Sequence, residues 1–149
     1  MKLLAGIALF LLCALAGESR SRRLQRRAQA LLKLFELIRE IGERQLTALL
    51  SFQESALRCP PSSEREQLLE LARGKEPSMP LLTAEEQSAL AAYARSETRS
   101  PAALRAERDA LLALLQRSRE QTAAELKNKG QVYRSVGYLT GAAALLLVL

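Results

Sequence analysis

Charge is distributed unevenly along the chain, leaving two apolar ends and a charged middle. Residues Leu3 to Ala16 carry no charge, and neither do Val136 to Leu149. Each of these segments has 14 residues, so as a helix each would be about 21 Å long. The hydrocarbon core of a bilayer is about 30 Å thick. Length alone therefore does not decide between a membrane span and a buried helix.

The middle of the chain has the apolar periodicity of helices. From Leu24 to Phe52, apolar side chains follow one another at alternating spacings of four and three, with a dilution at Gly42 and Gln45. This spacing predicts one long helix over about 19–55. Additional apolar positions widen the stripe, which favours packing against more than one neighbour.

Local signals predict where the shorter helices begin and end. Pro60 and Pro61 end the first helical region. Ser62 or Ser63 can cap the next helix, and Ser63 with Glu66 fits a capping box. That helix should run to about Arg73, with Gly74 as its C-terminal cap.

Two more helices should follow in the second half of the middle region. Thr83 with Glu86 fits another capping box and predicts a helix to about Ser96. Ser100, followed by proline at the first helical position, should open the last helix, which Gly130 would kink or break. No segment has the pattern of a strand. The fold class is therefore predicted as all-α: an antiparallel helical bundle between an N-terminal transmembrane helix (1–17) and a C-terminal one (132–149), with a cytoplasmic domain over 18–131.

Basic residues lie on the inner side of both apolar segments. Positive residues hold the side of a span that they flank in the cytoplasm. Both clusters therefore predict a cell-membrane protein whose middle is cytoplasmic and whose termini are both outside. The flanking residues are Arg20, Arg22, Arg23, Arg26, Arg27, Lys127, Lys129 and Arg134.

Two other interpretations remain open at this stage. With Lys2 as its basic start and a cleavage site after Ala16, the first segment resembles a signal peptide, and the chain would then be a secreted helical protein. Alternatively, both ends are core helices of a soluble helical adaptor. The arginines directly after the first segment argue against export. The absence of a polar face from Gly141 to Leu149 argues against a bundle helix.

The composition offers little for catalysis. The chain has no histidine, and Asp109 is its only aspartate. Cys13 and Cys59 are isolated and form no metal or redox motif. No phosphate-binding loop or nucleophile motif occurs. We therefore expect a non-enzymatic protein without cofactor or metal. Because aromatic residues are not interleaved with the basic ones, nucleic acid is not expected as a partner.

One stretch near the C-terminus has a pattern that resembles a known family. Its elements are Tyr133, Arg134, Ser135, Gly137 and Gly141, followed by an aliphatic tail. Together with the opening Met1–Gly6, the arginine cluster and the helix start at Thr83, this layout resembles the stage III sporulation protein AB family.

The resemblance implies a specific role and partners. The middle region would be similar to the F-protein domain of type II secretion machines. The chain would be a structural component, needed for spore development, of the secretion-like channel complex between mother cell and forespore. It would lie in the mother-cell membrane around the forespore. Its partners would be the membrane and other subunits of that complex, including a cytoplasmic ATPase. A homo-oligomer is also compatible with this role.

Overall fold

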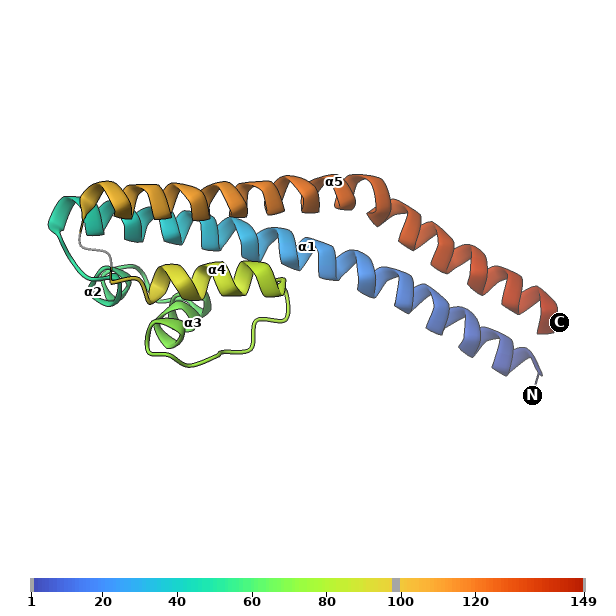
Figure 1. Cartoon of the computed structure of the whole chain (residues 1–149). Coiled ribbons are helices and arrows are strands. Elements are labelled where there is room, and N and C mark those ends of the chain that lie inside the picture. The colour runs from blue at the N-terminus through green and yellow to red at the C-terminus, as the bar shows by residue number, and fades with distance from the viewer. Residues whose placement is uncertain (1, 98–99, 149) are drawn as a thin grey trace. The chain divides into compact units, whose positions relative to one another are not determined.

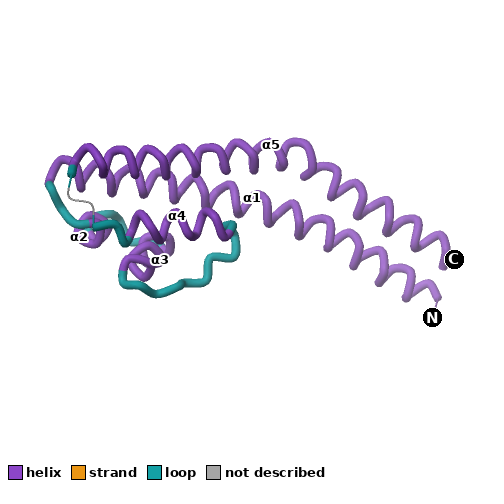
Figure 2. Tube along the Cα trace, viewed as in Figure 1, coloured by secondary structure: helices purple, strands orange, loops and turns teal. Residues whose placement is uncertain are grey.

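The computed structural model describes residues 2–97 and 100–148, and in these residues it is all-helical, without a strand (Figures 1 and 2). This confirms the all-α prediction. The helices are α1 (Lys2–Ala48), α2 (Phe52–Leu57), α3 (Ser63–Ala72), α4 (Ala84–Ala94) and α5 (Pro101–Val148).

The chain divides into two compact units, and α1 and α5 contribute to both. Unit 1 contains Met1–Ala28 and Glu120–Leu149, and unit 2 contains Gln29–Arg119. The membrane segments predicted from charge, 1–17 and 132–149, both lie inside unit 1. Their basic flanks lie in unit 1 as well, because this unit extends to residue 28 on one side and begins at residue 120 on the other. The predicted membrane boundaries themselves stay a prediction.

Unit 2 contains the hydrophobic core. All 17 buried hydrophobic residues found among the described residues lie in it. The long helices α1 and α5 both contribute side chains to this core. The helices α3 and α4, which pack on each other, contribute as well. The wide apolar stripe predicted for the first helix is confirmed here. The fully buried large side chains include Leu31, Ile38 and Ile41 of α1, Leu68 of α3, Leu90 of α4 and Leu115 of α5.

The first helix ends earlier than predicted. It was expected to continue to Ser55, but α1 ends at Ala48 and Leu49 takes a left-handed conformation with φ 53°. Ser51 then caps the separate helix α2. Its Oγ accepts a bond from the Glu54 amide (3.2 Å), and the Glu54 carboxylate accepts one from the Ser51 amide (3.1 Å). A local capping box thus overrides an apolar periodicity that continues through Phe52.

Replacing Leu49 with glycine should raise the free energy of unfolding by about 0.5–1 kcal/mol, because L-residues are strained in the left-handed region and glycine is not. Little packing is lost, since Leu49 is 80% exposed. Leu57→Gly, at the end of α2, is the control and should be destabilising. Denaturant unfolding of the two variants measures the difference. A loss of stability in Leu49→Gly would contradict the strain.

The caps of α3 are partly as predicted. Its N-cap is Ser62, whose Oγ accepts from the Arg65 amide at 3.1 Å. The capping box predicted between Ser63 and Glu66 is therefore wrong, because the helix begins one residue earlier than that box requires. The C-terminal prediction is confirmed, since Gly74 follows the cap with φ 81°.

The starts of α4 and α5 are confirmed. Thr83 and Glu86 form the predicted capping box, in which the Thr83 amide donates to the Glu86 carboxylate at 2.9 Å. The helix α4 ends at Ala94, two residues before the predicted end. Pro101 is the first residue of α5, as predicted. However, α5 continues through Gly130 without a break.

Candidate functional site

The two helices of unit 1 touch through glycines. A Cβ atom at Gly17 would overlap the carbonyl oxygen of Tyr133, and one at Gly137 would lie 2.8 Å from the carbonyl oxygen of Cys13. Further along, a Cβ at Gly141 would lie 3.0 Å from the Phe10 carbonyl oxygen. The backbones therefore approach so closely that no side chain fits between them. Because the numbers fall along α1 as they rise along α5, the helices run in opposite directions where they touch.

Unit 1 is inverted relative to a water-soluble core. Of the 15 exposed large hydrophobic residues that the structure describes, 12 lie in unit 1. Leu12 is 64% exposed, Leu139 70% and Leu147 88%. Residues buried in the described part of unit 1 are small instead: Gly6, Gly17, Ser21, Thr122, Gly130, Gly137 and Gly141.

Aromatic side chains accompany the glycine contacts. The rings of Phe10 and Tyr138 lie 6.4 Å apart and are tilted by 41°. The guanidinium of Arg20 lies 5.8 Å from the centre of the Tyr133 ring, within cation–π distance. Two residues that the sequence singled out for separate reasons are thus neighbours.

The eight basic residues predicted as flanks, hereafter the basic belt, all lie in unit 1. Seven of them are exposed, while Arg27 is half-buried and donates from Nε to the Thr122 hydroxyl at 3.2 Å. Arg22 pairs with Glu18 at 2.8 Å. A Cβ at Gly130 would lie 3.6 Å from the Ser21 hydroxyl. The clusters of α1 and α5 therefore share one level of the helix pair.

Net charge is confined to the same unit. Unit 1 contains nine basic and three acidic residues, whereas unit 2 contains thirteen of each. The whole formal charge of +6 therefore belongs to the unit with the exposed leucines.

The residues of the C-terminal pattern, Tyr133 to Gly141, differ in their burial. Gly137 and Gly141 are buried against α1, and Tyr133 is half-buried beside Gly17. Arg134 and Ser135 are exposed. The sequence pattern alone does not mark Gly17 and Gly130 as contact residues. The spacing of Gly130, Gly137 and Gly141 by seven and four residues, which places them on one helix face, was the available signal.

Among the described residues, α1 is the one helix with a segment long and apolar enough to cross a membrane. Core helices of soluble proteins and signal sequences can meet the same criterion. A core helix, however, is mostly buried, whereas 17% of this apolar segment is buried here. The apolar segment of α1 is therefore mostly exposed, and α1 stays one candidate for crossing a membrane.

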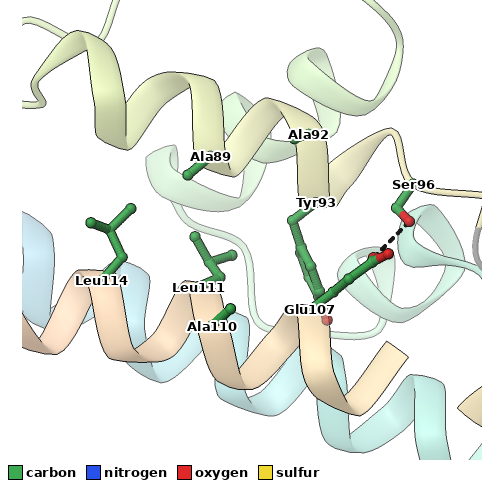
Figure 3. Close-up of a pocket in the computed structure, with 8 residues that line it drawn as sticks. All are labelled: Ala89, Ala92, Tyr93, Ser96, Glu107, Ala110, Leu111 and Leu114. Carbon is green, nitrogen blue, oxygen red and sulfur yellow. Dashed lines mark hydrogen bonds between the residues drawn. The ribbon is translucent and has the colours of Figure 1, made fainter. Parts of the chain in front are cut away.

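Unit 2 has an apolar cavity of about 520 Å³ between α4 and α5 (Figure 3). At one end the Ser96 hydroxyl donates to the Glu107 carboxylate at 2.7 Å. The volume is within the range of small-ligand sites. Its remaining lining is mainly alanine and leucine, which suits an apolar ligand or side chain: Ala89, Ala92, Tyr93, Ala110, Leu111 and Leu114.

Tyr93, which lines the cavity, also contacts α1 and α2. The Tyr93 hydroxyl donates to the Gln45 side chain at 2.9 Å, and its ring meets Phe52 edge-on at 5.8 Å. Cys59 is buried, and burial raises the pKa of its thiol, which disfavours the nucleophilic thiolate. In the part of the chain that the structure describes, no three histidine, cysteine or acidic side chains come together as metal ligands.

Alkaline pH should destabilise unit 2 through Tyr93. Burial raises the pKa of Tyr93 to about 12, so its contribution is complete below the unfolded value of about 10 and is lost as pH rises toward the folded value. The loss should be about 2–3 kcal/mol. In Tyr93→Phe this part of the pH dependence should disappear, as measured by unfolding free energy against pH. Parallel profiles for the two proteins would contradict the assignment.

The comparisons with known proteins add no relative. No protein-family model matches the chain, and neither does a curated protein or a solved structure.

Proposed function

We propose that the chain is a non-catalytic, membrane-anchored platform protein. The apolar part of α1 and that of α5 cross the membrane as a pair, and both termini are outside. Unit 2, in the cytoplasm, provides a helical surface for other proteins.

The observation that carries the proposal is the inverted packing of unit 1. Exposing a leucine side chain to water, rather than burying it, costs about 1.5–3 kcal/mol. Leu12, Leu139 and Leu147 are all more than half exposed. In lipid this exposure carries no such cost, and helices associate there through small residues that let their backbones approach. Glycines inside and leucines outside are the arrangement that a bilayer favours.

The pairing also supports retention of the N-terminal segment. Cleavage after Ala16 would remove Phe10 and Cys13, which cover Gly141 and Gly137. Gly141 would then lose its backbone contact with Phe10, and Gly137 would lose its contact with Cys13. The interpretation as a secreted protein leaves these contacts without a role, and a soluble adaptor leaves the exposed leucines in water.

The basic belt supports the orientation. It lies on the inner side of both apolar segments, and positive residues favour the cytoplasmic side. A short span of about 21 Å is extended by arginine side chains, which reach along the helix toward the interface. Tyr133 beside Arg20 fits an interfacial position, where tyrosine is enriched.

The role in a machine follows from the resemblance described above. By analogy with the stage III sporulation protein AB family, unit 2 would connect a cytoplasmic ATPase to membrane rings in the channel between mother cell and forespore. A unit without net charge and with an apolar cavity is compatible with binding other subunits or further copies.

Reporter fusions at both termini and within the 74–80 loop test the topology. We expect both termini outside and the loop inside, and the protein should stay in the membrane after carbonate extraction. A cytoplasmic terminus would overturn the topology, and release by carbonate would support the soluble adaptor. A mature N-terminus at Gly17, measured by mass spectrometry, would support the secreted protein.

A further inference from the structure

We infer that the basic belt binds the anionic headgroups of phospholipids, so that the anchor selects acidic lipids from its bilayer. This inference rests on the proposed membrane pairing of unit 1. It adds a ligand to that site, because an orientation signal alone requires no particular lipid.

The position of the belt matches the headgroup layer. Arg20 and Arg134 adjoin the apolar segments, and Arg20 lies over Tyr133, at the level of Gly17. From Arg20 to Arg27 the helix rises about 10 Å, and the polar layer of one leaflet is about 5–7 Å thick. The first arginines therefore lie among the headgroups. The last lie within a Debye length, about 8–10 Å, of the anionic surface.

Belt residues are exposed on both helices. Gly17 and Ser21 of α1 are buried against α5, whereas Arg22, Arg23 and Arg26 are exposed. Lys127, Lys129 and Arg134 are exposed on α5. Lipids lie against both helices of a transmembrane pair, so headgroups can reach the exposed basic residues of α1 and of α5 at the same time.

Charge complementarity favours the same ligand. Unit 1 has nine basic residues against three acidic ones, and one of the acidic ones, Glu18, is paired with Arg22. Arginine binds phosphate oxygens in a bidentate manner. Each basic residue near an anionic surface strengthens binding by about fivefold. Unit 2 has no net charge to contribute.

The test uses the full chain in nanodiscs, which make both membrane faces accessible and remove any effect of orientation. Spin-labelled phosphatidylglycerol and phosphatidylcholine are compared by the fraction of each that the protein immobilises. We expect several-fold preference for phosphatidylglycerol, weakening as salt is added. Inorganic phosphate at the same phosphate concentration should not compete, because it lacks the bilayer's positioning.

Two variants with the same charge change make the result specific. The variant Arg22→Gln, Arg23→Gln, Arg26→Gln, Lys129→Gln should lose most of the preference for phosphatidylglycerol. The control variant Arg39→Gln, Arg58→Gln, Arg105→Gln, Arg117→Gln changes exposed residues of unit 2 and should keep the wild-type preference. A protein that inserts but immobilises both lipids equally would overturn the inference and leave the belt for an acidic protein. Failure of the wild-type protein to insert would instead overturn the proposed membrane pairing.

Discussion

Replacing Gly17 with alanine should weaken the helix pair of unit 1 by about 2–3 kcal/mol. The added Cβ would overlap the carbonyl oxygen of Tyr133, and Gly137 lies directly beside it. Both neighbours are backbone atoms, which cannot rotate away as a side chain can. The helices would have to separate along their contact. Intrinsic propensity predicts the opposite sign, because alanine stabilises a helix by about 0.5–1 kcal/mol relative to glycine.

Gly130→Ala is the matched control on the opposing helix. A Cβ there would lie 3.4 Å from a Leu126 methyl carbon and 3.6 Å from the Ser21 hydroxyl, which are ordinary contacts. This variant should be neutral or slightly more stable.

The separation of the pair can be read in micelles by pulsed EPR during an SDS titration. Spin labels would replace the exposed Leu9 and Leu139 in a background with both cysteines changed to alanine. The labels should separate at a lower SDS fraction in Gly17→Ala than in Gly130→Ala. Equal midpoints would show that the glycines do not hold the pair together.

The helices of unit 2 were largely predictable because their signals are local. Thr83 and Glu86 lie three residues apart, and Pro101 marks a helix start by its own geometry. The error at Leu49 has the same origin, because apolar periodicity and a capping box competed within a few residues. Phe52 is buried, as the apolar periodicity predicts, although this residue lies in α2 and not in α1.

The candidate site was only half predictable. The basic residues around Arg20 and Lys127 stand next to uncharged segments in the sequence. The belt could therefore be predicted without a structure. The contact between Gly17 and Gly137 joins residues 120 positions apart. Which residues face each other across two helices depends on their rotation and register, and a single helix does not encode its partner's register. The glycines therefore appeared only as part of a sequence pattern.

The proposed membrane pairing would give the two units different surroundings. Leu31 and Leu115 are hidden from solvent in unit 2, whereas Leu12 and Leu139 are exposed in unit 1. The hydrophobic effect stabilises the first arrangement in water and opposes the second. A bilayer reverses the second preference, since lipid tails are as apolar as leucine. If unit 1 lies in a bilayer, unit 2 should therefore keep its stability in a detergent that leaves water around it, independently of unit 1.

Leu90→Ala tests this independence and should destabilise unit 2 by about 3 kcal/mol. Leu90 is fully buried in α4, within the core shared with Leu68 and Leu115. Truncation removes apolar contacts and leaves a cavity that helices held by other contacts cannot fully close. Leu57→Ala, at a residue that is 57% exposed, is the control and should change stability by less than about 0.5 kcal/mol.

Hydrogen exchange of the full chain in micelles measures the two units separately. In Leu90→Ala, slowly exchanging amides of unit 2 should exchange about 100-fold faster, because their protection depends on opening of that core. Amides of residues 4–17 should keep their wild-type rates, since the glycine contacts at Gly137 and Gly141 are unaffected. Equal acceleration in both units would mean that α1 and α5 transmit the loss along their length. The chain would then unfold as one cooperative body, and the stability of unit 1 would depend on that of unit 2.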